Sequence, residues 1–158
     1  MTPTEFKQKY GNDFAVSCLG SGLFPSVAIA QAAVESGWGK YVAGNNMFGI
    51  KATGDPSKFP HWDGSYVTSR TSEFENGGYV RQTSRFRKYL TVGDSVKDRN
   101  WLLSHSDRYK SVIAAQTPED QARAIKACGY ATDPYYADKL ISIINTYNLK
   151  QFDEKKKS

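Results

Sequence analysis

The sequence has few of the residues that build metal centres and disulfide frameworks. Its 158 residues include two cysteines and two histidines. Cys18 and Cys128 are too few and too far apart for a disulfide scaffold or a zinc knuckle, so we expect buried free thiols, with a single bridge as the alternative. His61 and His105 lack the spacing of metal ligands, which argues against zinc peptidases and zinc amidases. We therefore predict a protein without a metal or cofactor.

Long apolar runs are also missing. No stretch approaches the length needed to span a bilayer, and the first residues, MTPTEFK, lack the form of a signal peptide. We expect no transmembrane segment, and a chain that is either cytosolic at synthesis or trimmed of its leader. The sequence also lacks a stripe of interleaved basic and aromatic residues, which argues against nucleic-acid binding.

A mild excess of positive charge is present. The formal net charge is +5, and the tail after Leu149 contributes +2 of it through four lysines against Asp153 and Glu154. We expect residues 150–158 to be disordered and residues 1–149 to form one domain, for which 39% hydrophobic residues is an ordinary content. A mildly basic body suits a polyanionic partner such as a bacterial wall polymer, and an ordinary solvated surface is the alternative.

The spacing of apolar and turn-forming residues predicts an α+β fold that is mainly helical. The start of the chain has the form of a capping box, and Gly11 is expected to separate a first short helix from a second one. Residues 41–66 lose helical periodicity and are expected to form a long loop. Two β-prone runs around Asn76-Gly77-Gly78 predict a hairpin. Further helices are expected at residues 25–36, 92–105, 109–113, 117–129 and 132–147.

The helix expected at residues 25–36 carries the most informative acid. Val, Ile and Ala occur on every side of it, as in a core helix, and a single carboxylate, Glu35, lies near its end. Gln31 lies one turn earlier on the same side, so the two side chains predict a narrow polar line on the wall of a cleft. Burial and the negative end of the helix dipole would both raise the pKa of Glu35, as a general acid requires. The alternative is a glutamate that caps a loop or pairs with a basic residue.

A second candidate carboxylate lies on the expected hairpin. Glu73 and Glu75 are two residues apart and therefore point the same way on a strand. If the hairpin folds over the cleft, one of them would face Glu35, and paired carboxylates across a sugar are the basic requirement of glycoside hydrolysis. Solvated surface charge is the other interpretation of acids near a hairpin turn.

Three segments of the sequence carry a family pattern in the same order along the chain. They are AQAAVESGWG at residues 30–39, NNMFGIK at residues 45–51 and GYATDPYYADKL at residues 129–140. Together they resemble the glucosaminidase family, glycoside hydrolase family 73, which includes bacterial autolysins, phage lysins and the hydrolase domain of the flagellar protein FlgJ. The resemblance covers residues 6–148. It implies a lysozyme-like α+β fold whose one small β-hairpin insertion borders the substrate cleft.

The resemblance also implies an activity and roles for single residues. The activity is that of an endo-β-N-acetylglucosaminidase, which hydrolyses the β-1,4 bond after N-acetylglucosamine in peptidoglycan. Glu35 falls on the general acid, Glu73 on the hairpin carboxylate proposed as the base, and Tyr130 on a tyrosine near the reacting sugar. The other residues expected at the substrate are Gln31, Trp38, Asn46, Phe48, Trp62 and Tyr135. We expect a monomer that acts on glycan strands at the cell wall, in the periplasm or outside the cell.

Several alternatives stay open at the level of the sequence. Phe48 and Trp62 would either stack on a sugar or pack inside the fold, and Trp38 would either shield Glu35 or close the helix end. Single displacement or help from the substrate's acetamido group is favoured over a covalent intermediate. An N-acetylmuramidase specificity, or a non-catalytic wall-binding or assembly module, would share the fold, although the presence of Glu35 favours an enzyme. A cysteine peptidase based on Cys128 is disfavoured, because a helix C-terminus opposes a thiolate.

Overall fold

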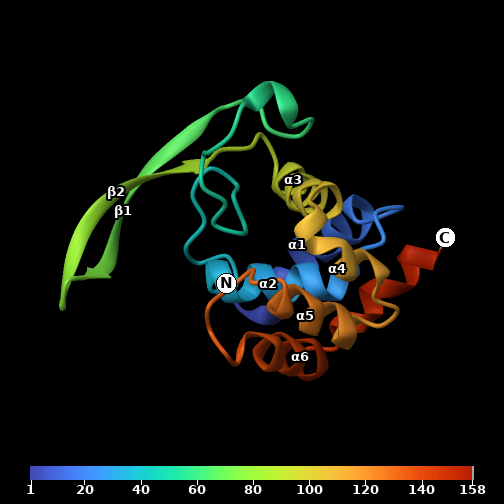
Figure 1. The fold of residues 1–158 in the computed structure, drawn as a ribbon. Coiled ribbons are helices and arrows are strands. Elements are labelled where there is room, and N and C mark those ends of the chain that lie inside the picture. Colours follow the sequence, from blue (N-terminus) through green and yellow to red (C-terminus); the bar gives the residue numbers. More distant parts are fainter. Residues whose placement is uncertain (158) are drawn as a thin grey trace.

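A two-stranded hairpin projects from one side of a helical body (Figure 1). The computed structural model describes residues 1–157, without the side chains of residues 71–75 and 154–157. The helices are α1 (Pro3–Ser17), α2 (Pro25–Ser36), α3 (Val92–His105), α4 (Lys110–Ala114), α5 (Pro118–Ala127) and α6 (Tyr136–Thr146). Three 3-10 helices, η1 (Pro56–Lys58), η2 (Asp107–Tyr109) and η3 (Leu149–Lys157), and the strands β1 (Tyr66–Glu75) and β2 (Gly78–Arg87) complete the fold. The predicted α+β architecture with one inserted hairpin is confirmed.

Helix α2 lies at the centre of the body and packs against α1, α5, α6 and η3. Pro25 begins it with a favourable φ, and Gly37 ends it in the left-handed conformation at φ 58°. Its first nine residues are all buried, which confirms the predicted core helix. The last turn differs, because Val34 and Glu35 are exposed.

Helix α1 is continuous, so the predicted break at Gly11 is wrong. Gly11 is buried in the middle of the helix, where a glycine costs roughly 0.5 to 1 kcal/mol relative to alanine. A Cβ atom at this position would lie 2.4 Å from the ring of Phe152. Gly11 is therefore the site at which the end of the chain packs closely on α1, and not a helix terminator.

Residues 150–153, which the sequence assigns to a disordered tail, pack against the helices. Lys150 forms an ion pair with Glu119, and Phe152 packs on the hydrophobic core. The carboxylate of Asp153 accepts hydrogen bonds from the backbone N–H of Ser26 at 2.8 Å and from its hydroxyl at 2.6 Å. Helix α2 has no side-chain cap from its own N-cap residue, so Asp153 supplies that cap from the other end of the chain. Residues 150–153 therefore belong to the folded body.

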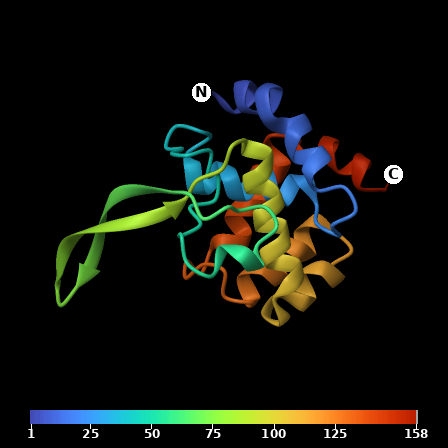
Figure 2. The same ribbon diagram turned by 90° about the horizontal axis from the view of Figure 1, so that it is seen from above.

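The hairpin confirms the prediction made from its turn residues. Its strands pair in register from Tyr66 opposite Arg87 to Glu75 opposite Gly78. Asn76 and Gly77 both have positive φ, as a two-residue turn between twisted strands requires. Residues 50–52 follow the other edge of β2 at its root, where the N–H of Arg87 donates to the carbonyl of Ile50 at 2.9 Å. Beyond this root the hairpin stands clear of the helices (Figure 2).

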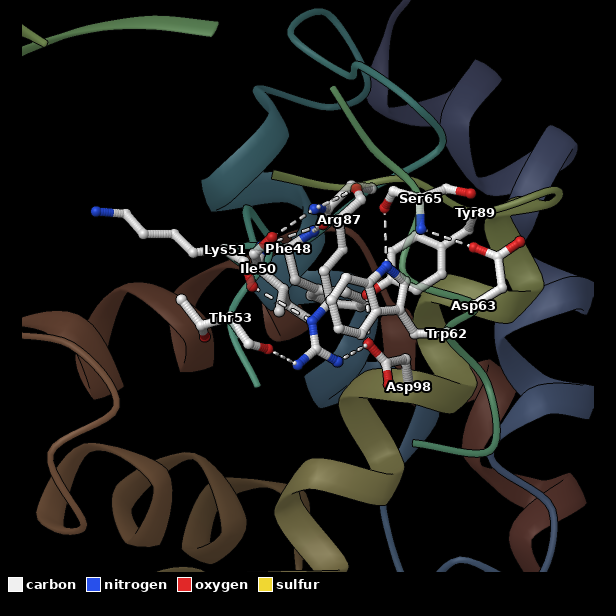
Figure 3. Close-up of polar contacts among 11 residues, drawn as sticks. Phe48, Ile50, Lys51, Thr53, Trp62, Asp63, Ser65, Arg87, Tyr89 and Asp98 are labelled. Atoms are coloured by element: carbon white, nitrogen blue, oxygen red, sulfur yellow. Dashed lines mark hydrogen bonds and ion pairs between the residues drawn. The ribbon is translucent and has the colours of Figure 1, made fainter. Parts of the chain in front are cut away.

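A buried ion pair fixes the hairpin root to α3 (Figure 3). Arg87 donates to Asp98 Oδ2 at 2.9 Å and to the carbonyl of Thr53 at 2.8 Å, and the hydroxyl of Tyr89 donates to the same carboxylate oxygen. The ring of Trp62 lies 4.0 Å from the guanidinium carbon of Arg87. A buried charge needs such partners to offset the loss of hydration. The root is therefore the rigid part of the hairpin.

The cysteines are free, as the sequence predicts. Cys18 is buried and Cys128 is half-buried. None of the helices in residues 1–157 combines the length and the apolar character needed to cross a membrane.

Candidate active site

A pocket of about 300 Å³ lies where the end of α2 meets the loop after it and the root of the hairpin. Its lining residues are Glu35, Tyr41, Ala43, Asn46, Gly49, Ser69 and Phe86. Glu35 is the single carboxylate among them. Ser69 comes from β1 and Phe86 from β2, so the hairpin forms one wall of this cleft and α2 the other.

Glu35 lies at the last turn of α2 with its carboxylate open to the cleft. A Cβ atom at Gly49, on the loop opposite, would lie 3.9 Å from Glu35 Oε2, so the glycine leaves space in front of the acid. Protein atoms cover the rest of the side chain, and this burial raises the pKa of Glu35. No described residue forms a hydrogen bond or ion pair with Glu35 within the structure. Glu35 thus leaves the core at the point where the cleft begins, and its role as a general acid stays a prediction.

Gln31 does not line the cleft, contrary to the prediction. Its side chain is fully buried, and Oε1 accepts hydrogen bonds from Arg99 Nε at 2.9 Å and Nη2 at 2.5 Å. Its Nε2 donates to the hydroxyl of Tyr136 at 3.1 Å. The polar line on α2 consists of an exposed acid and a buried amide with different roles. Gln31 holds a buried guanidinium beneath the site, because a buried charge without partners is very costly.

Tyr130 joins this buried network through Tyr136. Its ring stacks on that of Tyr136, with centroids 6.1 Å apart, and meets Tyr109 edge-on. Burial is the main cause that raises the pKa of Tyr130, and the charge of Tyr136 and of Glu35 adds to it. The pKa of Tyr136 is likewise raised, by burial first, to about 12. Both phenols therefore keep their protons near neutral pH, and Tyr130 is close enough to Glu35 to feel its charge.

Asn46 shapes the loop that faces Glu35 and also lines the pocket. Its Oδ1 accepts from the N–H groups of Phe48 and Ile50, each at 3.2 Å, and its Nδ2 donates to the carbonyls of Ile50 and Arg87. All the hydrogen bonds of its amide thus go to backbone groups. Phe48 is buried in the core with its ring tilted against that of Phe14, which favours the packing role over the contact with substrate.

The chain was compared with protein families and solved structures. The family model described as mannosyl-glycoprotein endo-beta-N-acetylglucosaminidase matches residues 12–149. The chain belongs to the glucosaminidase family. The resemblance stated from three sequence segments is confirmed, and so is membership among the glycoside hydrolases.

Individual relatives agree with this glucosaminidase assignment. The exo-glucosaminidase LytG of Bacillus subtilis is 36% identical over 140 residues, which are 84% of this chain and 47% of LytG. The peptidoglycan hydrolase FlgJ of Vibrio parahaemolyticus is 40% identical over 129 residues, 77% of this chain and 40% of FlgJ. The chain thus spans less than half the length of these curated relatives.

Solved structures confirm the lysozyme-like fold of the glucosaminidase family. The catalytic domain of the autolysin Auto from Listeria monocytogenes superposes with a TM-score of 0.80 at 32% identity, and the match covers 96% of this chain and 87% of that one. A truncated glycoside hydrolase domain of FlgJ from Salmonella typhimurium gives a TM-score of 0.77 at 33% identity, with 93% and 98% covered.

Three aromatic residues predicted at the substrate lie outside the cleft lining. Trp38 packs against Phe6 and Tyr147, with ring centroids 5.5 and 4.8 Å away, and so closes the helix end. Trp62 is buried at the hairpin root, where its Nε1 donates to a backbone carbonyl at 2.8 Å. Tyr135 is 66% exposed and is not part of the cleft lining. These residues shape the fold or the surface, and the pocket wall does not include them.

Sequence reasoning missed several residues that do line the pocket. Tyr41 is 72% exposed at its edge, and Ser69 and Phe86 face it from the hairpin root. For Ser69 and Phe86, the one available signal in the sequence was strand alternation, since residues two apart on a strand face the same side. Glu73 pairs with Val80 in the ladder, but its side chain lies outside the described residues. Among the described residues, no group of three His, Cys, Asp or Glu side chains is placed to hold a metal ion.

Proposed function

We propose that this chain is a peptidoglycan hydrolase that cleaves the β-1,4 bond after N-acetylglucosamine within glycan strands, with Glu35 as the general acid. The observation that carries this proposal is the position of Glu35, a partly desolvated carboxylate with a raised pKa at the mouth of a cleft. The name of the family supports cleavage after N-acetylglucosamine, and the name of the FlgJ relatives supports peptidoglycan as the polymer.

The proposed role of Glu35 follows from its surroundings. A carboxylic acid that is partly withdrawn from water keeps its proton to a higher pH and can donate it to the leaving glycosidic oxygen. The pocket of about 300 Å³ that Glu35 lines is large enough for a sugar. Because no described cation neutralises the carboxylate, its protonated form is not disfavoured by an ion pair.

The second catalytic group is proposed to be Glu73 of β1. Its backbone lies four residues beyond the pocket residue Ser69, which is about 13 Å along a strand. Glu73 can therefore act as the base only when the outer half of the hairpin bends toward α2 around the substrate. The alternative is nucleophilic help from the substrate's own acetamido group, with Glu73 orienting that group. Either route needs no covalent enzyme intermediate.

Tyr130 and the aromatic residues of the cleft are proposed to position the sugar. The hydroxyl of Tyr130 is protonated and lies close to Glu35, so it can donate a hydrogen bond to the acetamido group or to water. Tyr41 and Phe86 take the sugar-stacking role that the sequence assigned to Phe48 and Trp62, because they line the pocket. The enzyme is proposed to work as a monomer at the bacterial cell wall.

Analysis of the digestion products tests this proposal. Purified protein should lower the turbidity of a peptidoglycan suspension, and mass spectrometry of the borohydride-reduced fragments should find N-acetylglucosaminitol at their ends. Fragments of several disaccharides should appear early, as internal cleavage requires. The Glu35→Gln variant is the control and should release nothing above background.

The names of two relatives suggest other cleavage specificities, and products of either kind would overturn the proposed bond or the proposed internal cleavage. A protein of Lactococcus lactis named as a probable N-acetylmuramidase is 35% identical over 143 residues, and ends in N-acetylmuramitol would give this chain that specificity. Release of single terminal sugars from the start would indicate exo action, as the name of LytG states for that protein.

A further inference from the structure

The two faces of the hairpin differ in charge. Residues opposite one another in an antiparallel ladder share a face, and faces alternate along each strand. Ser69 and Phe86 line the cleft, so their face is the cleft face, and its described side chains are all uncharged: Val67, Ser69, Val80, Gln82, Ser84 and Phe86. The other face, here called the outer face, carries Tyr66, Thr68, Arg70, Tyr79, Arg81, Thr83, Arg85 and Arg87. Its described side chains thus include four arginines and no acid. Arg87 is buried at the root in its ion pair with Asp98, and the three exposed ones are here called the outer-face arginines.

The outer-face arginines form a row along the hairpin. Arg81 and Arg85 are four residues apart on β2, about 13 Å, and Arg70 lies between them because it pairs with Thr83. All three are exposed. In the part of the chain that the structure describes, none of them forms an ion pair with a carboxylate. The guanidinium of Arg85 lies 4.6 Å from the ring centroid of Tyr66, which holds it in place without neutralising it.

Burial confirms which face is turned to solvent. On β2, Gln82, Ser84 and Phe86 are half-buried, whereas Arg81 and Arg85 are exposed. The hairpin also stands clear of the helical body in the view from above (Figure 2). The arginines are therefore directed away from the cleft and cannot contact the sugars bound next to Glu35. A ligand for them must lie outside the cleft, on the far side of the hairpin.

We propose that the outer face of the hairpin, through Arg70, Arg81 and Arg85, binds the carboxylates of stem peptides on peptidoglycan next to the strand being cut. This inference rests on the proposed function, because that function makes peptidoglycan the polymer around the enzyme. The peptides of peptidoglycan end in carboxylates. Its glycan is uncharged wherever the lactyl carboxyl group is joined to a peptide by an amide bond. Arginine suits such groups because its planar fork pairs with a carboxylate through two hydrogen bonds. The outer face thus selects peptide-bearing wall, and the cleft face, to which Glu73 belongs in the ladder opposite Val80, receives the glycan.

Binding to insoluble wall tests the inference without turnover. Protein with the Glu35→Gln change is sedimented with peptidoglycan whose phosphodiester polymers have been removed with hydrofluoric acid. Adding Arg70→Gln, Arg81→Gln and Arg85→Gln should weaken binding about tenfold at low ionic strength, since exposed ion pairs contribute roughly 0.2 to 1 kcal/mol each. Replacing the same three residues by lysine should restore most of the binding. Lys9→Gln, Lys97→Gln and Lys110→Gln together remove the same charge elsewhere on the exposed surface and should change binding less than twofold.

A chemically altered ligand identifies the group that is bound. Peptidoglycan whose carboxylates have been coupled to ethanolamine keeps its glycan and peptides but loses the negative charge. The protein with all three arginines should bind this amidated wall only weakly. Its affinity should equal that of the triple Gln variant for unaltered peptidoglycan, and added salt should change it little. Undiminished binding to the amidated wall would overturn the inference. Binding that disappears when phosphodiester polymers are removed would also overturn it, because the partner would then be a phosphate polymer.

Activity separates this inference from the proposed function. The triple Gln variant with Glu35 intact should lose about tenfold in kcat/KM on peptide-bearing wall. It should lose less than twofold on glycan strands freed of peptide by an amidase, once the lactyl carboxylates that this cleavage exposes have been coupled to ethanolamine. An equal loss on both substrates would overturn the inference, since the arginines would then serve the glycan. Absence of hydrolysis by the unaltered protein on either substrate would refute the proposed function instead, and the sedimentation result would still decide the role of the arginines.

Discussion

The two walls of the cleft are built in opposite ways. Helix α2 is surrounded by other helices and carries one exposed acid at its end, whereas the hairpin is an extension that the body holds only at its root. An isolated two-stranded ribbon is marginally stable by itself, so its outer half depends on the backbone ladder and on ligands. In the proposed mechanism the roles divide in the same way: the rigid wall holds the proton donor, and the adaptable wall approaches the polymer.

The hairpin repeats this contrast within itself. At the root, Arg87 and Asp98 are almost completely buried and tie β2 to α3. Farther out, Tyr79 is 81% exposed. Regions with few buried contacts open at the lowest free-energy cost, so the outer half is the part expected to move when a glycan enters.

Removing the acid from the rigid wall should have the largest effect. Glu35→Gln keeps the shape of the side chain but has no acidic proton, so kcat should fall by about 10² to 10⁴-fold, the usual contribution of a general acid. Circular dichroism should show an unchanged helix content. A variant that still cleaves at a tenth of the normal rate would remove Glu35 from the mechanism.

The next largest effect is a loss of stability when the buried contact between Gln31 and Arg99 beneath the rigid wall is removed. Gln31→Leu removes the acceptor of two Arg99 hydrogen bonds and leaves the buried guanidinium with Asn100, which should lower the free energy of unfolding by about 3 to 5 kcal/mol in urea titrations. Gln31→Glu is the matched control, because it keeps an acceptor for Arg99 and should cost clearly less. If Gln31→Leu lost less than about 1 kcal/mol, α2 would not depend on this pair.

On the adaptable wall, Glu73→Gln should lower kcat by about 10²-fold if Glu73 is the base. Glu75→Gln changes a neighbouring acid on the same strand and should leave kcat nearly normal. Initial rates of reducing-end release measure both. Near-normal turnover of Glu73→Gln would transfer the role to Tyr130 or to the acetamido group of the substrate.

The cap at the beginning of α2 should give a smaller effect. Asp153→Ala removes both hydrogen bonds to Ser26 and should cost about 1 kcal/mol, or about 2 to 4 °C in Tm. Asp153→Asn retains an acceptor, so its Tm should lie between those of the unaltered protein and of Asp153→Ala. Differential scanning calorimetry distinguishes them, and an unchanged Tm in Asp153→Ala would show that the end of the chain does not stabilise α2.

The smallest expected effect is a pH-dependent difference in Tm between the unaltered protein and Glu35→Gln. Its folded pKa lies above the ordinary value of 4.5, so the stabilising effect of its proton is complete below about pH 4.5 and is lost as the pH rises through the folded pKa. At pH 7 the folded state therefore favours a neutral group over the carboxylate at this position, and Glu35→Gln should melt a little higher than the unaltered protein. At pH 4 the two Tm values should coincide. A lower Tm at pH 7 would contradict the direction of this pKa shift.

The sequence alone predicted the elements whose causes are local. Helix α2 has its start, its end and its apolar character within one stretch, so its bounds were correct, and the hairpin turn was recognisable from Asn76 and Gly77. Glu35 was identified because an acid after an apolar helix is unusual. The glucosaminidase family followed from three segments in order.

The errors arose where the partner lies far away in the chain. Gln31 was assigned to the substrate because its partner Arg99 is 68 residues away. Gly11 was interpreted as a break because the ring that fills its space belongs to Phe152. The tail was expected to be disordered because no local pattern shows that Asp153 meets Ser26, 127 residues earlier. Phe48 and Trp62 were placed at the sugar for the same reason, since aromatic residues in loops look alike until the core is assembled.

The docking of the last residues onto α1 and α2 has a practical consequence. The described chain ends across the molecule from the hairpin in both views (Figures 1 and 2). Protein immobilised on beads by that end would present its cleft outward and should still digest insoluble wall. Shortening the protein to residue 149, where the family match stops, would instead delete Phe152 and Asp153 and weaken the support beneath the acid.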